Sequence, residues 1–141
     1  MPIEHSIDHP RRLILARGHG TLTGEDIFGY QKAVWTSAEV AGYDELMDMG
    51  DVQHIALESI DRVQQLARYS AGMDASSSRS KFAIVAPSDI AYGLGRMYQT
   101  YRALDERSTK QVGVFRSWEK ALEFLGRQAD AGDLAPPGGA P

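Results

Sequence analysis

The side chains best suited to acid–base or metal chemistry are the four histidines and a group of acidic residues near one predicted strand end. An acid–base enzyme would pair Asp48 with His19 or His54, one group taking a proton and the other giving it. His5 and His9 lie on a predicted strand and turn, where a spacing of four does not place two ligands on one metal-binding face. No spacing brings Asp48 close to a histidine. We therefore predict no catalytic residue, no metal site and no cofactor, and we rank an enzyme last among the functions considered.

Nucleophile and phosphate-loop chemistry find little support in the sequence. There is no cysteine, which excludes a disulfide framework, a thiol nucleophile and Cys-ligated metal sites. No serine has a histidine at a recognisable spacing. Two Gly-x-Gly pairs, at 18–20 and 93–95, lack the full spacing of a dinucleotide or Walker motif. Because Gly93 and Gly95 fall inside a predicted helix, they indicate either close packing against a neighbouring backbone or room for a ligand.

Length and composition are typical of one globular domain. The chain has 141 residues, 43% hydrophobic and 24% charged, with a net charge of −4 when the histidines are neutral. This mildly acidic balance predicts no generic nucleic-acid binding. The apolar runs are far shorter than the ~20 residues that span a bilayer, and the first residues do not resemble a signal peptide, so we expect a cytoplasmic protein with no membrane span. A Gly/Pro/Ala-rich tail, 127–141, is expected to be disordered and leaves 1–126 as the domain.

Hydrophobic periodicity predicts strands that alternate with helices. The strongest signal is the apolar run 82–86, which a proline ends and a serine follows, as in a buried strand leading into a capped helix. The expected order is β-β-α-β-α-β-α-β-α. Strands are predicted at 3–8, 12–17, 45–49, 82–86 and 111–115, and helices at about 24–40, from 57 or 58, from 88 or 89 to about 106, and after Ser117. This is an α/β fold with a single mixed sheet of about five strands, an N-terminal hairpin followed by β-α repeats.

Several local signals set the expected ends and faces of these elements. Thr23 is expected to cap the first helix, with Asp26 completing a capping box. The glycines at 18–20 are expected to break the second strand. Gly50 and Asp51 are expected to end the third strand, leaving 52–56 as an irregular crossover. The third helix is expected to turn inward a stripe made of Ile90, Leu94, Met97, Tyr98 and Tyr101.

Five segments carry a family resemblance. They are GTLT (20–23), LMDM (46–49), KFAIVA (81–86), AYGLGRMY (91–98) and VFRSWEKALEFL (114–125), of which the last two are the most specific. Together they resemble the SpoIIAA-like, or STAS/SEC14-related, superfamily of small bacterial proteins over about residues 3–126. The resemblance implies a sheet with about four helices packed largely on one face.

The resemblance also implies where a regulatory site would lie. In the anti-sigma-factor antagonists of this superfamily, a partner kinase phosphorylates a serine that follows an aspartate, at the start of the helix after the third strand. Asp48 matches the strand-end aspartate, and the phosphoacceptor position falls near Leu57 or Glu58, with Ser59 one or two places away. The Asp-Ser pair is missing here. The SEC14 side of the resemblance implies a pocket for a lipid or another apolar small molecule.

Two binding functions remain open. As a non-enzymatic interaction or regulatory module, the protein would bind a partner protein or itself, as a homodimer, through large aromatic side chains. The predicted anchors are Phe28, Trp35, Tyr92 and Tyr98. As a carrier or sensor, it would hold an apolar small molecule, such as a fatty acid, between the sheet and the third helix. The predicted pocket residues are Tyr92, Gly93, Met97, Tyr101 and Trp118.

Overall fold

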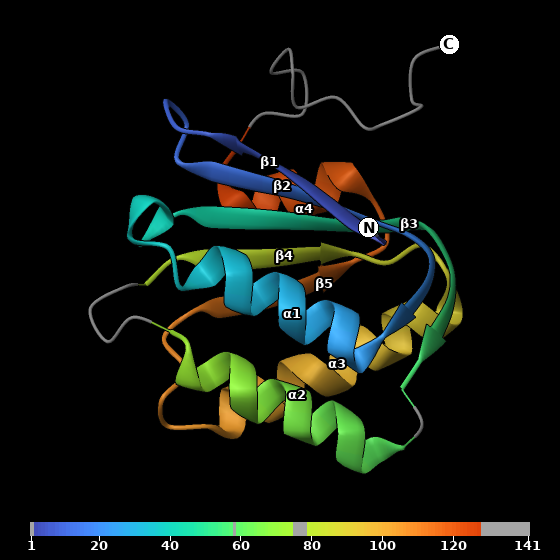
Figure 1. Cartoon of the computed structure of the whole chain (residues 1–141). Helices are drawn as coiled ribbons and strands as arrows, with labels where there is room; N and C mark the ends of the chain where they lie inside the picture. The colour runs from blue at the N-terminus through green and yellow to red at the C-terminus, as the bar shows by residue number, and fades with distance from the viewer. Residues whose placement is uncertain (1, 58, 75–78, 128–141) are drawn as a thin grey trace, which may run out of the picture.

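The computed structural model describes residues 2–57, 59–74 and 79–127, which form one five-stranded sheet with four α-helices (Figure 1). In chain order the elements are β1 (Ile3–Asp8), β2 (Leu13–Thr23), α1 (Gly24–Trp35), the 3₁₀-helix η1 (Ala38–Val40), β3 (Asp44–Ala56), α2 (Ile60–Gly72), β4 (Lys81–Val85), α3 (Asp89–Leu104), β5 (Gln111–Phe115) and α4 (Trp118–Leu125). The predicted order of strands and α-helices is confirmed.

The sheet is mixed, and its strands lie side by side in chain order. β1 pairs antiparallel with β2, as the predicted hairpin, and β2 to β5 run parallel. α1, α2 and α3 cover one face, where Tyr30, Val63 and Phe82 belong to the larger core (Figure 1). α4 covers the other face and packs on a smaller cluster that includes Leu13 and Leu122. The predicted α/β architecture, with the helices largely on one face, is confirmed.

β2 and β3 are longer than the sequence predicts. β2 continues through the glycines at 18–20, and β3 continues through Gly50 and Asp51. The two strands pair in parallel along this extension, with a register shift next to Gly20. Gly20 has a φ of 62°, a conformation that glycine adopts at no steric cost. The glycine therefore allows an irregularity within a continuing strand instead of ending it, and 52–56 is part of a strand, not an irregular crossover.

Side-chain caps set the starts of the helices. The Thr23 hydroxyl accepts a hydrogen bond from the N–H of Asp26, and the Asp26 carboxylate accepts one from the N–H of Thr23, which confirms the capping box. Ser88 and Ser117 cap α3 and α4. Ser59 caps α2, so this helix begins later than the predicted position 57 or 58.

The first helix ends earlier than the prediction. α1 stops at Trp35 and does not reach position 40, because Ser37 caps the separate 3₁₀-helix η1 by accepting a hydrogen bond from the N–H of Glu39. Most of the tail predicted to be disordered lies outside the described residues. Its first residue, Arg127, is described and donates a hydrogen bond to Asp44 at 3.2 Å.

α3 buries a different stripe from the predicted one. Ile90 is 72% exposed in the first turn, although its hydrophobicity suggested an inward position. The buried residues are Ala91, Gly95, Tyr98 and Arg102, which follow one another at helical spacing. Of the residues in the predicted stripe, only Tyr98 is buried. Because Ala91 and Gly95 are small, the helix can approach the sheet closely.

Gly93 and Gly95 provide a matched test of how closely α3 packs. A Cβ added to Gly95 would lie 2.9 Å from Cγ1 of Val114 in β5, whereas a Cβ added to Gly93 would meet nothing within 4 Å. Gly95→Ala should therefore lower the free energy of unfolding by about 1–3 kcal/mol through overpacking. Gly93→Ala should raise it by up to about 1 kcal/mol, since alanine favours a helix interior. Urea unfolding of both variants checks this, and equal effects would contradict close packing at Gly95.

Candidate functional site

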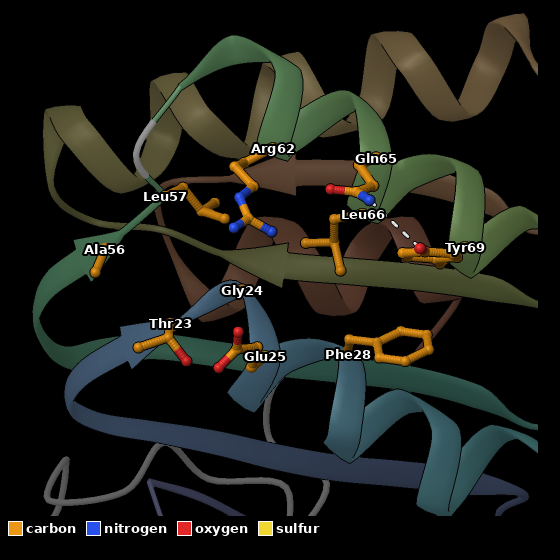
Figure 2. A pocket seen from close by; sticks show the side chains of 10 residues that line it. All are labelled: Thr23, Gly24, Glu25, Phe28, Ala56, Leu57, Arg62, Gln65, Leu66 and Tyr69. Atoms are coloured by element: carbon orange, nitrogen blue, oxygen red, sulfur yellow. Dashed lines mark hydrogen bonds between the residues drawn. The ribbon is translucent and has the colours of Figure 1, made fainter.

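A pocket lies where the first turns of α1 face α2 and the end of β3 (Figure 2). It has a volume of about 470 Å³. Its lining residues come from the end of β2, from α1, from β3 and the residue after it, and from α2. They are Thr23, Gly24, Glu25, Phe28, Ala56, Leu57, Arg62, Gln65, Leu66 and Tyr69.

α2 presents its side of the pocket because of helical spacing. Ser59 caps the helix, and Arg62, Leu66 and Tyr69 follow at intervals of four and three residues. Figure 2 shows these three side chains on the side of α2 that faces α1. Leu66 is buried, whereas Tyr69 is half exposed. One helix face therefore supplies a cation, an aliphatic floor and an aromatic wall.

An aromatic pair closes one end of the pocket and joins the two helices. The ring centroids of Phe28 in α1 and Tyr69 in α2 are 4.9 Å apart, with the rings tilted by 41°. The Gln65 side-chain amide donates a hydrogen bond to the Tyr69 hydroxyl at 3.3 Å. Such pairs contribute beyond their buried area, so this contact helps to fix the separation of α1 and α2.

Two opposite charges point into the pocket. Figure 2 shows the Arg62 guanidinium and the Glu25 carboxylate directed toward the space between α1 and α2. Glu25 lies in the first turn of α1, where the partial positive charge of the helix N-terminus favours an acidic side chain. The pocket thus combines charged and polar side chains with aromatic and aliphatic walls, and small-molecule sites likewise use placed polar groups to orient a ligand.

A smaller cavity lies behind the pocket, between the sheet and the helices α1, α2 and α3. Its volume is about 70 Å³. Leu57 and Leu66 line both spaces and so stand between them. Met47 and Met49 add flexible thioether side chains to the wall. The remaining lining residues are Leu22, Ile27, Gln31, Ile55, Val63, Phe82, Ile84, Ala91, Leu94, Gly95 and Tyr98.

The five predicted pocket residues do not come together. Tyr92, Gly93, Met97 and Tyr101 lie on α3, whereas Trp118 lies on α4, across the sheet. None of them lines either of the two cavities described above. The predicted location, between the sheet and α3, is where the smaller cavity lies, but other residues form its walls. A ligand role for these five residues stays a prediction.

The four predicted interface residues make contacts within the chain. Phe28 packs on Tyr69, and the Trp35 indole N–H donates a hydrogen bond to Glu45 at 2.7 Å. Tyr98 is only 6% exposed. The Arg116 guanidinium lies 4.2 Å from the centre of the Tyr92 ring, and Arg96 donates to the Tyr92 hydroxyl at 3.2 Å. A partner role for these four residues likewise stays a prediction.

The acid–base pairs considered from the sequence are not seen. Asp48 accepts hydrogen bonds from the Trp118 indole at 3.1 Å and from the N–H of Gly50 at 2.8 Å. His19 lies instead 3.6 Å from Glu4 and 3.9 Å from Asp51, and its side chain is 38% exposed. Within residues 2–57, 59–74 and 79–127, no group of three or more His, Asp or Glu side chains is arranged to hold a metal ion. In the same part of the chain, no helix is both long and apolar enough to cross a membrane.

Most residues that line the larger pocket are not identified from the sequence. The sequence predicts Phe28 as an interface anchor and Leu57 as a helix start near the phosphoacceptor position, and neither as a pocket residue. One available signal was Tyr69, a large aromatic residue that falls off the buried stripe of α2. Phe28 falls off the stripe of α1 in the same way. Two such residues on successive helices indicate a contact or cavity between those helices.

Comparison with known proteins identifies the fold. No protein-family model and no curated protein matches the sequence. Among solved structures, an uncharacterised protein of the DUF3478 family from Shewanella loihica PV-4, described as having a SpoIIAA-like fold, aligns with a TM-score of 0.54 and 16% identity over 87% of this chain and 93% of that one. This chain has a SpoIIAA-like fold. The anti-sigma factor antagonist SpoIIAA in its unphosphorylated form aligns less closely, with a TM-score of 0.44 and 12% identity over 88% and 97% of the two chains.

In this SpoIIAA-like domain, the position predicted for a phosphoacceptor offers no free hydroxyl group among the described residues. Leu57 lines the pocket, and Glu58 lies outside the described residues. The nearest hydroxyl in the sequence is that of Ser59, which accepts a hydrogen bond from the N–H of Arg62 at 3.3 Å. The hydroxyl closest to the predicted position therefore caps α2.

Proposed function

We propose that this SpoIIAA-like protein is a non-enzymatic binding domain that carries or senses a small amphipathic molecule. The supporting observation is a pocket of about 470 Å³ that shares Leu57 and Leu66 with an apolar cavity under α3. Pockets of about 300–1,000 Å³ with mostly apolar walls and a few polar groups are typical of small-ligand sites. The fold by itself implies no ligand, so the proposal depends on this pocket.

The chemistry of the pocket favours a ligand with a singly charged anionic head. Arg62 offers a guanidinium that forms charge-assisted hydrogen bonds with a carboxylate. Glu25 on the opposite side repels a second negative charge. An apolar tail would pass between Leu57 and Leu66 toward Met49. A medium-chain fatty acid has these properties, and side chains in the wall must move to admit its tail.

Switching by phosphorylation of an Asp-Ser pair is not part of this proposal. The pair is missing from the sequence, and the Ser59 hydroxyl is engaged in capping α2. A binding domain that responds to a ligand in its pocket requires no such modification. The proposed response is a change in the packing of α1 against α2, the two helices that the ligand would contact.

Filling the pocket with a large side chain should abolish ligand binding. Ala56 lines the pocket at the end of β3, so Ala56→Trp should occupy the space with an indole ring. We expect the affinity for the fluorescent fatty acid 11-(dansylamino)undecanoic acid to fall at least about tenfold, equivalent to about 1.4 kcal/mol. Dansyl emission during titration of the dye with protein measures this.

Ala33→Trp is the matched control for this experiment. Ala33 lies on the exposed face of α1, away from the pocket lining, so the added indole should leave dye binding unchanged. Circular dichroism confirms that both variants are folded. Equal affinity of the wild-type protein and a folded Ala56→Trp variant would contradict the proposed site.

A second candidate function is self-association, which a set of exposed apolar side chains supports. Ile60 is 60% exposed in the first turn of α2, and Ile90 is 72% exposed in the first turn of α3. These two helices pack against each other. Contiguous exposed apolar patches mark interaction surfaces, and we propose that Ile60 and Ile90 contribute to one such patch. The homodimer predicted from the sequence would use this surface together with Tyr92.

Sedimentation velocity tests the dimer directly. The wild-type protein should sediment as a dimer whose fraction rises with concentration, and Ile60→Asp/Ile90→Asp should sediment as a monomer under the same conditions. Thr100→Asp, at an exposed position of α3, serves as a control for the effect of one added surface carboxylate and should keep the dimer. A wild-type monomer at every concentration would contradict this second function and would leave the pocket proposal unaffected.

A further inference from the structure

A buried carboxyl group lies in the core beneath the end of α1. Glu45, at the start of β3, is 1% exposed. In the sheet it lies between Ile14 of β2 and Phe82 of β4, both of which belong to the larger hydrophobic core. A carboxylate in such surroundings loses its hydration, so its charge must be compensated or it takes up a proton.

The hydrogen bonding of Glu45 is incomplete. The Trp35 indole N–H donates to Oε1 at 2.7 Å. The other oxygen, Oε2, and the hydroxyl of Tyr30 are both buried, and neither makes a hydrogen bond of good geometry within the described residues. The two groups still interact with each other, because the Tyr30 hydroxyl favours the charged form of Glu45. Burial raises the pKa of Glu45 to about 7, and the Trp35 hydrogen bond, the Lys110 charge and Tyr30 only partly oppose it.

Two cationic side chains lie near Glu45 but form their hydrogen bonds with other groups. Lys110, just before β5, donates to the Ser80 hydroxyl at 2.9 Å, and burial lowers the pKa of Lys110. Arg102 of α3 lies 5.7 Å from the centre of the Trp35 ring but pairs with Asp74, beyond the end of α2, at 2.7 Å. Among the described residues, no cation forms an ion pair with Glu45.

The other elements around this site add no counter-charge. From α3, Tyr98 packs on Phe82 with the ring centroids 6.3 Å apart and the rings nearly perpendicular, and burial raises the pKa of its hydroxyl. From β1, the His5 ring centroid lies 5.8 Å from that of Tyr30. β2 and β4 present the apolar neighbours Ile14 and Phe82. Trp35 is therefore the one strong hydrogen-bond donor to Glu45 within the described residues.

We propose that Glu45 is a proton-operated latch for the C-terminal turn of α1. With Glu45 protonated, the carboxyl is neutral and Trp35 stays packed on Phe82 and hydrogen-bonded to Glu45. When Glu45 ionises, the Trp35 hydrogen bond becomes stronger, but burial outweighs that bond. The buried charge therefore gains hydration if the Trp35 turn moves away from the sheet. The proposed movement is confined to this turn, because α1 ends at Trp35 and the separate η1 follows.

The latch acts on the proposed ligand site through α1, and this part of the inference rests on the proposed function. Phe28, which forms a wall of the pocket, lies two turns before Trp35 on the same helix. Release of the C-terminal turn would change the angle of α1 and therefore its contact with Tyr69 of α2. Proton release would thereby open the pocket.

The direction of the pH dependence follows from linkage. The pKa of Glu45 is about 7 in the folded state and 4.5 for an unperturbed glutamate, so the folded state binds this proton more tightly. The stabilisation is complete below pH 4.5 and is lost as pH rises through about 7. Between these limits the folding equilibrium constant should fall on the order of a hundredfold. Glu45→Gln, which keeps an oxygen acceptor for Trp35, should remove this loss.

Tryptophan fluorescence tests the latch without any ligand. In Trp118→Phe, Trp35 is the remaining tryptophan, and its quenching by the neutral quencher acrylamide should rise with a midpoint near pH 7. The same titration in Glu45→Gln/Trp118→Phe should show constant quenching. Urea unfolding of both proteins at pH 5 and pH 8 should show a stability loss only where Glu45 is present.

Each alternative outcome overturns the latch. Constant quenching of Trp35 in the presence of Glu45 would mean that the turn does not move, even if stability changes with pH. A pH-dependent change that persists in Glu45→Gln would assign the effect to another group. Because these measurements use no ligand, their failure is independent of the dye-binding test: loss of the latch with intact dye binding would refute only this inference.

Discussion

Asp74→Ala should lower the free energy of unfolding by about 3–5 kcal/mol, because it leaves a buried guanidinium without its partner. The side chains of Arg102 and Asp74 are 1% and 0% exposed, and their charged groups are 2.7 Å apart. The same carboxylate oxygen accepts hydrogen bonds from the backbone N–H groups of Thr109, at 2.8 Å, and Lys110, at 3.1 Å. Asp74 thus ties the end of α2 to the segment before β5. Urea unfolding at neutral pH measures the loss.

The cost of an unpaired charge is separable from the cost of lost backbone contacts. Arg102→Met in the Asp74→Ala background removes the unpaired guanidinium and should recover part of the lost stability. Glu123→Ala breaks an exposed pair with Lys120, 3.5 Å away, and should change stability by less than about 1 kcal/mol. A loss for Asp74→Ala as small as that for Glu123→Ala would contradict the structural role of this buried pair.

Leu22→Ala should have the second largest effect, on stability and on ligand preference together. Leu22 is 0% exposed and lines the smaller cavity. Its truncation should cost about 2–5 kcal/mol, from lost apolar burial and from the enlarged cavity. If that cavity receives the tail of a ligand, the added space should shift the preferred fatty-acid length toward longer chains. Competition of fatty acids of increasing length against the dansyl dye measures the preference.

Leu13→Ala is the matched control for this prediction. Leu13 is equally buried, at 0% exposed, but belongs to the cluster under α4 on the opposite face of the sheet. The truncation should cost a similar 2–5 kcal/mol and leave the chain-length preference unchanged. The same shift in both variants would show that reduced stability, and not cavity volume, alters binding.

Short-range signals explain why much of the fold is predictable from the sequence. The capping box of Thr23 and Asp26 and the cap at Ser117 act within a few residues, and both are confirmed. The strand at 111–115 follows equally from its local hydrophobic pattern and matches β5. The order of these elements then restricts the sheet to few topologies, because crossovers between parallel strands are right-handed.

The longer strands depend on contacts that a local pattern does not contain. The extension of β2 beyond its glycines is paired with the extension of β3, as in the register of Leu22 with Ile55. These residues are far apart in the chain. Local sequence around Gly20 and Gly50 favours a turn, and the pairing of the two strands overrides that preference.

The buried charges and the pocket were unpredictable for a related reason. Glu45 and Arg102 have side chains that are usually at the surface. Their burial depends on Trp35 and Asp74, which reach them from other elements. The pocket depends on the separation of α1 and α2, and the sequence signals for that space are Phe28 and Tyr69, each off the inward stripe of its helix.

Methyl-resolved NMR during titration with decanoic acid tests the proposed ligand site most directly. Binding at the proposed site should change the chemical shifts of the methyl groups of Leu57 and Leu66, which line both the pocket and the smaller cavity. Leu13 and Leu122, on the α4 face, should be unaffected. Unchanged Leu57 and Leu66 signals at saturating decanoic acid, or changes confined to the α4 face, would contradict the proposed binding function.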